Sequence, residues 1–263
     1  MTTGFFMKIN LRLFAALKAS AYHLVGCIVV ASIVASIVLK FWYPFPYGQL
    51  AGGQGLLLLL FSVDVVCGPV LTFILFSPQK TRKEFVVDLV VVVFIQCAAL
   101  LYGLHVLAEA RPIALIYEID RFRVISRADI YEVELNEIPP WVSPWSFSAP
   151  RLQSLRRSLK GSELVESMEL AGAGVELSQR PSRWQDYYLD VAEIKIRARN
   201  LSVLLEKYPG NSRLIKDHIV SGCGDGVQVV WLPLVSRHAN DWIVFLSQAT
   251  LNPCAFFRAD GFI

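Results

Sequence analysis

Two long apolar runs joined by a short basic turn dominate the hydrophobic pattern of the chain. The first, LLLLLFSVDVVCGPVLTFILF, covers residues 56–76, and the second, FVVDLVVVVFIQCAALLYGLHVL, covers residues 85–107. The turn between them, SPQKTRKE, carries three basic side chains. A helix needs about 20 apolar residues to cross a hydrocarbon core of roughly 30 Å. The pattern therefore predicts a transmembrane hairpin.

A third apolar run, residues 21–42, precedes the hairpin, and the chain continues through the aromatic and proline-rich sequence FWYPFPY. Aromatic rings gather at the headgroup region and prolines end a helix, so this run predicts another transmembrane helix. A cleaved signal peptide is the alternative, although its apolar region is normally only about 7 to 15 residues long. Residues 1–20 combine basic and apolar side chains at helical spacing, which predicts a short amphipathic helix on the membrane surface.

Most of the charged residues follow the apolar runs, in residues 109–263. An apolar stripe over residues 191–208 predicts a helix, and the proline-rich stretch 139–150 predicts a rigid loop. Four segments rich in β-branched and aromatic side chains predict strands: residues 113–119, 122–125, 227–235 and 241–247. The expected fold class is an α-helical membrane region of three transmembrane helices, within residues 21–108, followed by an α+β extracytoplasmic domain.

The distribution of basic side chains predicts the orientation of the helices. Three basic residues precede the first helix and three lie in the hairpin turn, whereas residues 43–55 contain none. Cytoplasmic loops carry an excess of Lys and Arg, so the N-terminus and the hairpin turn are expected in the cytoplasm. Residues 43–55 and the domain over residues 109–263 are then expected outside.

Cysteine usage and charge narrow the possible functions. In an oxidising exterior, Cys223 and Cys254 are expected to form a structural disulfide, with two buried free thiols as the alternative. The sequence contains no CxxC pair, zinc-type spacing or catalytic signature, so we predict no metal site, no cofactor and no catalytic residue. The net charge of +3 is spread along the chain and gives no reason to expect a nucleic-acid partner.

Polar residues inside the hairpin are the leading candidates for a site. A charged Asp64 near the bilayer centre costs about 2.5–3.5 kcal/mol, so it should be protonated, paired or turned into the bundle. Counting across an antiparallel hairpin places Gln96 beside Asp64 as a hydrogen-bond partner. The same count places Asp88 level with His23, which allows a contact between them. Adhesion between helices and a site for a partner or substrate both remain open for these groups.

Pro69 adds a local irregularity to the same helix. Proline cannot donate a backbone hydrogen bond to the carbonyl oxygen of Val65, so the helix is expected to bend at Gly68-Pro69. A bent helix would leave a groove beside Asp64. The bend is compatible with either interpretation of the intramembrane polar groups.

Several short motifs occur in order along the first half of the chain. They are Trp42-Tyr43-Pro44; Asp64 with Gly68, Pro69, Leu71 and Thr72; Asp88, Leu89 and Gln96; Tyr102-Gly103; Arg111-Pro112; and Asp120-Arg121-Phe122. Residues 22–125, which contain them, resemble the TfpX/TfpZ-type family of type IV pilin accessory proteins, also described as FimB-like fimbrial assembly proteins. Residues 232–258 resemble the C-terminal part of that family, although Asn252-Pro253-Cys254 stands where a Pro-Trp ending is expected.

The resemblance implies a multi-pass protein of the bacterial inner membrane, with residues 109–263 in the periplasm. Such a protein would stabilise a cognate type IV major pilin and assist its assembly, without enzymatic activity. The alternatives are a membrane enzyme that modifies pilin, such as a transferase, and a small transporter subunit. The oligomeric state stays open. Candidate partner-binding residues lie in the hairpin and at the start of the outer domain: Asp64, Gly68, Pro69, Gln96, Arg111, Asp120 and Arg121.

Overall fold

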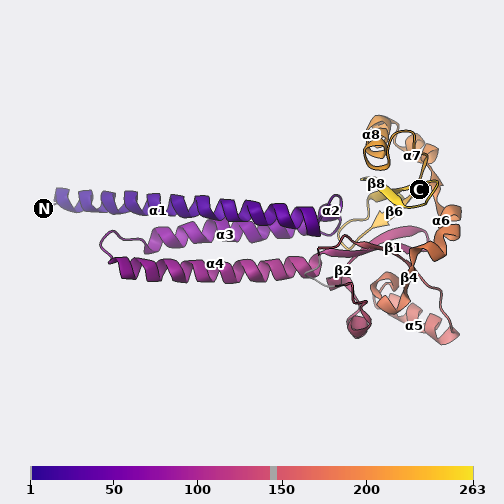
Figure 1. The fold of residues 1–263 in the computed structure, drawn as a ribbon, viewed down its shortest axis with the longest axis horizontal. Helices are drawn as coiled ribbons and strands as arrows, with labels where there is room; N and C mark the ends of the chain where they lie inside the picture. Colours follow the sequence, from indigo (N-terminus) through magenta and orange to yellow (C-terminus); the bar gives the residue numbers. More distant parts are fainter. Residues whose placement is uncertain (1, 143–146, 263) are drawn as a thin grey trace. The chain divides into compact units, whose positions relative to one another are not determined.

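The structure is a computed structural model that describes residues 2–142 and 147–262, with side chains described from residue 12 onward. The chain forms two compact units (Figure 1). We call the first the helical unit, which contains residues 1–41 and 54–108. We call the second the sheet unit, which contains residues 42–53 and 109–263.

Three long helices run side by side in the helical unit (Figure 1). Helix α1 spans Thr2–Ile37 and continues as a π-helical turn over Val38–Trp42, α3 spans Gly53–Leu75, and α4 spans Arg82–Ala110. These are the helices in the described part of the chain that are long and apolar enough to cross a membrane. Many of their large apolar side chains are exposed, which suits a surface that contacts lipid.

The first helix is longer than the sequence predicts. A separate surface helix is expected over residues 1–20, but α1 continues through this stretch without a break. No proline precedes Pro44, and Gly26 is the only glycine between Leu11 and Trp42. The sequence therefore contains no signal that would end a helix near residue 20.

An eight-stranded mixed sheet forms the centre of the sheet unit, as far as its residues are described. The strand order is β4-β3-β1-β2-β6-β7-β8, with β5 paired to β6. Strands β1 and β3 are parallel, as are β2 and β6, and the other neighbours are antiparallel. The strands are β1 Pro112–Glu118, β2 Arg121–Ser126, β3 Arg151–Leu155, β4 Trp184–Asp186, β5 Arg199–Asn200, β6 Val229–Val235, β7 Trp242–Ser247 and β8 Pro253–Phe257.

Apolar side chains from both faces of the sheet are buried, so β1 and β6 are buried along their whole length. On one face, Trp231 and Phe245 pack with residues of α7 and α8. The core on the other face includes Phe122 and Val244, with Ile194 of α6 packed among them. The helices of this unit are α2 Tyr47–Leu50, α5 Gly161–Gly172, α6 Val191–Arg197, α7 Leu201–Lys207 and α8 Ser212–Cys223.

The segment that connects α1 to α3 belongs to the sheet unit. Leu50 is fully buried in the core of this unit, and the Ser236 hydroxyl donates a hydrogen bond to the Leu50 carbonyl oxygen. The rings of Tyr47 and Phe256 meet edge to face, with centroids 5.9 Å apart. The connecting segment is therefore an integral part of this body rather than a loose loop.

The expected fold class is confirmed: three long apolar helices precede a mixed sheet with helices. The four predicted strands correspond to β1, β2, β6 and β7, whereas the helix expected over residues 191–208 is split into α6 and α7 by β5. The split occurs because Arg199 and Asn200 pair with β6, and the Trp231 indole donates to the Asn200 carbonyl oxygen at 3.0 Å. In the proline-rich loop, residues 143–146 lie outside the described residues, and the rest forms no helix or strand.

Candidate functional site

A hydrogen-bonded cluster joins the three long helices inside the helical unit. Its centre is His23 of α1, whose Nδ1 lies 2.5 Å from the Thr72 hydroxyl oxygen and whose Nε2 lies 2.9 Å from Gln96 Oε1. An amide oxygen can only accept, so His23 Nε2 carries the proton and donates to Gln96. Nδ1 then accepts from the Thr72 hydroxyl, and a neutral imidazole satisfies both contacts.

The amide nitrogen of Gln96 completes this cluster. Nε2 donates to the backbone carbonyl oxygen of Asp64 at 3.1 Å and to Cys27 Sγ at 3.4 Å. Gln96 therefore links α4 to both α1 and α3. Hydrogen bonds between helices help hold a bundle together in lipid, where the hydrophobic effect does not drive association.

Two glycines let α3 and α4 approach each other. Gly68 lies beside the Gln96 amide of the cluster, and Gly103 lies farther along α4. A Cβ at Gly68 would lie 2.1 Å from Gln96 Nε2, and a Cβ at Gly103 would lie 2.3 Å from Leu60 Cδ1. Both distances are too short for an alanine to be accommodated without movement. Gly68 thus makes room for the Gln96 amide, and Gly103 makes room for an apolar contact.

Helix α3 continues through Pro69. The Ser20 hydroxyl of α1 donates to the Pro69 carbonyl oxygen at 2.8 Å. Together, Ser20, His23 and Cys27 occupy one face of α1, at spacings of three and four residues. This spacing is a signal from which the role of α1 in the cluster could have been recognised.

A cavity of about 240 Å³ lies between the three helices next to this cluster. Most of its wall is apolar, and Asp64 is the carboxylate in its lining. The residues around it come from α1, α3 and α4: His23, Gly26, Cys27, Val30, Ala31, Phe61, Asp64, Val93, Gln96, Cys97 and Leu100. The cavity could accept an apolar group that also presents a polar atom to Asp64.

The structure brings Asp64 and Gln96 together, but through the backbone of Asp64 rather than through its carboxylate. The contact between His23 and Asp88 that their common depth allows does not form. Asp88 instead pairs with Lys80 at 2.5 Å, because the short turn before α4 brings the lysine back over the first helical turns. His23 is fully engaged with Thr72 and Gln96.

Arg111 directly follows α4 and is buried, with 2% of its surface exposed. Its Nη1 donates to the Ser148 carbonyl oxygen at 3.2 Å. Burial lowers the pKa of Arg111, whereas the proximity of Tyr43 raises it. Burial also raises the pKa of the Tyr43 hydroxyl, which therefore stays neutral. Arg111 braces the start of β1 inside the sheet unit and leaves little surface for a partner.

Asp120 lies in the turn between β1 and β2 and Arg121 is the first residue of β2, at the opposite end of β1 from Arg111. The seven residues of β1 span roughly 20 Å, so the structure does not gather these three candidates at one junction. Asp120 and Arg121 form an ion pair of 2.9 Å, and the Arg121 guanidinium lies 4.9 Å from the centre of the Phe262 ring. Both side chains are partly exposed and remain accessible.

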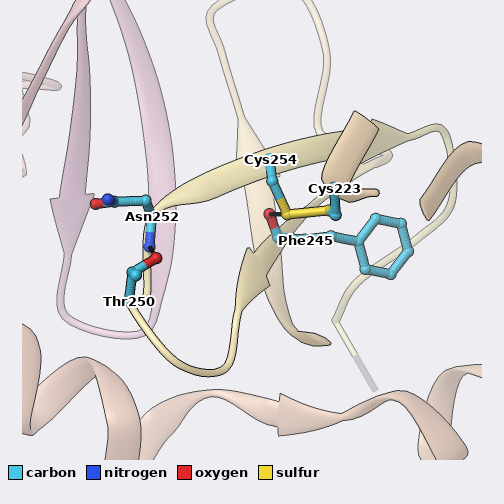
Figure 2. Close-up of a disulfide and its surroundings, with 5 residues drawn as sticks. All are labelled: Cys223, Phe245, Thr250, Asn252 and Cys254. Carbon is cyan, nitrogen blue, oxygen red and sulfur yellow. Dashed lines mark hydrogen bonds between the residues drawn. A yellow bond between two sulfur atoms is a disulfide. The ribbon is translucent and has the colours of Figure 1, made fainter. Parts of the chain in front are cut away.

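The sulfur atoms of Cys223 and Cys254 lie 2.00 Å apart and join the end of α8 to β8 (Figure 2). Cys254 Sγ is also 3.5 Å from the carbonyl oxygen of Phe245 in the neighbouring strand. Cys223 and Cys254 are the two cysteines for which the sequence predicts a disulfide.

The sheet unit also contains a buried ionic group that the sequence does not predict. Arg180 donates to Glu134 at 2.6 Å and to Glu166 at 3.0 Å, and the side chains of Arg180 and Glu134 are 7% and 6% exposed. Glu134 also accepts from the backbone of Ser182 at 3.0 Å. This group connects α5 to the short 3-10 turns around Glu134 and Arg180, and we see no local pattern in the sequence that would predict it.

Comparisons of the sequence with known proteins identify the family of this chain. The profile of the fimbrial assembly protein FimB matches residues 11–52. Fimbrial assembly proteins of Dichelobacter nodosus serogroups I and E1 are each 34% identical over 251 residues, which is 95% of this chain and 97% of each relative. The protein of serogroups C1 and C2 is 42% identical over 127 residues, 48% of this chain and 94% of that relative.

No solved structure matches the chain. The matched residues 11–52 include most of α1 and the connecting segment that is built into the sheet unit. The alignments with the serogroup I and E1 proteins extend across both units. Since these alignments cover nearly the full length of both partners at 34% identity, the chain belongs to the FimB family of fimbrial assembly proteins.

Proposed function

We propose that this protein is an inner-membrane accessory protein that holds a type IV major pilin and assists its assembly into the pilus. Relatives named as fimbrial assembly proteins support a role in pilus assembly. The observation that carries the finer proposal is the cavity of about 240 Å³ between three membrane helices, with Asp64 in its lining. An ionisable residue in such a position favours a binding role.

The helical unit would bind the membrane-spanning helix of the pilin. Helices associate in lipid through close packing and through hydrogen bonds between polar side chains. The three-helix unit offers an apolar cavity for packing and a polar group within that cavity. Gly68, Pro69 and Gln96 contribute by shaping the helices around Asp64, since Gln96 bonds to the Asp64 backbone across the space that Gly68 leaves.

The proposed topology places the N-terminus in the cytoplasm and the sheet unit in the periplasm. The lack of basic residues between residues 43 and 55 supports this orientation. Residues 42–53 and 109–263 form one compact body, which supports their location on the same side of the membrane. A disulfide between Cys223 and Cys254 is compatible with an oxidising compartment.

The sheet unit would contact the soluble part of the same pilin. A cavity of about 280 Å³ on this unit has Ile119 and Leu164 in its lining, and 61% and 53% of their surfaces are exposed. Exposed apolar patches on soluble domains commonly mark sites of protein interaction. Ile119 also has a φ of 60°, a strained conformation for a β-branched residue. Asp120 and Arg121 follow it directly and would lie at the edge of the contact.

A pull-down from native membranes tests the proposal. The tagged full-length protein is isolated in mild detergent, and mass spectrometry measures whether unassembled major pilin is enriched. Enrichment over an unrelated three-helix membrane protein supports the proposal, and its absence with intact protein contradicts it. An intact-mass comparison of pilin, with and without this protein in the cell, addresses the transferase alternative, because an unchanged mass supports the accessory role.

The Asp64→Leu variant tests the part played by the cavity. It is expected to lower the amount of surface pili while the accessory protein remains inserted and folded. Protein level in the membrane fraction and retention of the Cys223–Cys254 link provide the folding control. Normal piliation in this variant would limit Asp64 to a role in helix packing.

A further inference from the structure

We infer that Asp64 binds a hydrogen-bond-donating or cationic side chain that a partner helix brings into the cavity between α1, α3 and α4. This inference rests on the proposed function and deepens it, because it states the chemistry that the partner must supply at this depth. Three observations carry it: the cavity itself, the position of Asp64 in the cavity lining, and an accounting of the donors around that residue.

The donors of the neighbouring cluster are already engaged. His23 Nε2 donates to Gln96 Oε1, and the Thr72 hydroxyl donates to His23 Nδ1. Gln96 Nε2 donates to the Asp64 backbone oxygen and to Cys27 Sγ. A neutral histidine has one N–H and an amide has two, so this set of donors is complete. Apart from the weak S–H donors of Cys27 and Cys97, which also line the cavity, none is left for the carboxylate of Asp64.

The Asp64 carboxylate itself has no hydrogen bond or ion pair with any side chain or backbone group that the structure describes. The other acid of the hairpin differs in this respect, because Asp88 is paired with Lys80 at 2.5 Å. A carboxylate inside lipid must be protonated, paired or hydrated to offset the cost of about 2.5–3.5 kcal/mol. The fold pairs Asp88 from within the chain and gives the Asp64 carboxylate no such partner, so a donor on a second helix could pair with it.

A protein helix is the occupant that meets this requirement. Lipid acyl chains could fill the apolar wall of the cavity, but they contain no donor for Asp64. A membrane-spanning helix can present Lys, Arg, His, Ser, Thr, Asn or Gln at a chosen depth, together with apolar side chains for the rest of the wall. A positive charge or a hydrogen-bond donor on the partner helix complements Asp64. Val30, Phe61 and Val93 then contact the apolar side chains of that partner helix.

A set of host helices tests the inference with defined chemistry. The tagged full-length chain is co-expressed with a single-span Leu/Ala helix that carries Lys, Gln or Leu at its midpoint, and the co-purified host helix is quantified. One interhelical hydrogen bond contributes about 0.6–2 kcal/mol, so the Lys and Gln hosts should be retained about 3- to 30-fold more than the Leu host.

Variants locate the effect at one carboxylate. Asp64→Leu should abolish the preference for donors, with the protein level in the membrane fraction and the Cys223–Cys254 link as the folding control. Asp64→Asn keeps an acceptor oxygen, so it should retain the preference for Gln and lose most of the preference for Lys. Asp88→Asn is the matched control and should leave both preferences unchanged, because Asp88 is paired within the chain.

The inference is overturned if the wild-type chain retains all three hosts equally, or if the preference for donors survives in Asp64→Leu. Pilin enrichment without any donor preference would keep the proposed function and refute this inference. Donor preference in a chain that does not enrich pilin would support the site and refute pilin as its client. The two proposals can therefore fail separately.

Discussion

Replacement of Gly68 by alanine tests whether the Gln96 amide holds the three helices together. A Cβ at this position would lie 2.1 Å from Gln96 Nε2 and 2.6 Å from its Cδ. Both distances are far inside van der Waals contact. The amide is the end of a flexible side chain, so we expect it to rotate away while the backbone of α3 keeps its place.

Rotation of the amide would break two interhelical hydrogen bonds that have oxygen acceptors, besides the weaker bond from Gln96 Nε2 to Cys27 Sγ at 3.4 Å. These are the donation from Nε2 to the Asp64 carbonyl oxygen at 3.1 Å and from His23 Nε2 to Gln96 Oε1 at 2.9 Å. At about 0.6–1.7 kcal/mol each, their loss costs about 1–3 kcal/mol. Alanine has a higher helix propensity than glycine, which offsets up to about 1 kcal/mol. The expected net loss in the free energy of unfolding for Gly68→Ala is about 0–3 kcal/mol.

Reversible unfolding of the full-length chain in mixed micelles measures this change, and Gly26→Ala is the matched control. A Cβ at Gly26 would meet nothing within 4 Å, so this variant should be neutral or up to about 1 kcal/mol more stable. Gly68→Ala is then repeated in a Gln96→Ala background, where no amide is left to displace. An equal loss of stability in both backgrounds would refute the reasoning, because the clash would not involve Gln96.

Three further changes test the sheet unit by denaturant unfolding of the full-length chain. Cys223→Ser should lower the free energy of unfolding by about 3–4 kcal/mol, since the disulfide spans a sequence separation of 31 residues, and an unchanged midpoint without reductant would contradict it. Hydrogen bonds, first the one from Arg156 and then those from the Leu159 backbone and Arg183, lower the pKa of Glu163 from 4.5 to about 2, so the stability they contribute is present above pH 4.5 and is lost as the pH falls toward 2. Glu163→Gln should reduce the slope of stability against pH in that window, and an identical slope would contradict the assignment. Arg180→Ala leaves the buried carboxylate of Glu134 unpaired and should cost about 3–5 kcal/mol, whereas a loss below about 1 kcal/mol would show that this pair is dispensable.

Local composition predicts the secondary structure of those segments whose conformation depends mainly on their own sequence. The long apolar runs correspond to α1, α3 and α4, and the β-branched segments correspond to the most buried strands, β1, β6 and β7. The helix α8 was not predicted, although the buried Ile215 and Ile219 are four residues apart and give it an apolar face. Short edge strands such as β4 and β8 have weaker patterns and depend on their neighbours.

Long-range pairing overrides local pattern around Arg199. The apolar stripe over residues 191–208 favours one helix, but Arg199 and Asn200 pair with Trp231 and Val230 of β6. The Arg199 guanidinium also lies 5.2 Å from the centre of the Trp231 ring. Residues about 30 positions later in the chain therefore decide that the helix is interrupted, and a window of local sequence contains no trace of them.

In the helical unit, too, the sequence predicts only part of the geometry: it predicts how deep each polar residue lies along a helix, but not which face of the helix that residue occupies. Counting residues from the ends of the helices gives the depth of each polar group, which was enough to place Asp64 and Gln96 at one level. Each residue turns a helix by about 100°, so depth does not reveal which face a side chain occupies. The expected pair of His23 with Asp88 failed for this reason, since His23 turns toward Gln96 and Asp88 toward Lys80. The depth of Asp64 alone is equally compatible with adhesion between helices and with a partner site, and our inference of a partner site rests on the donors that surround it rather than on depth.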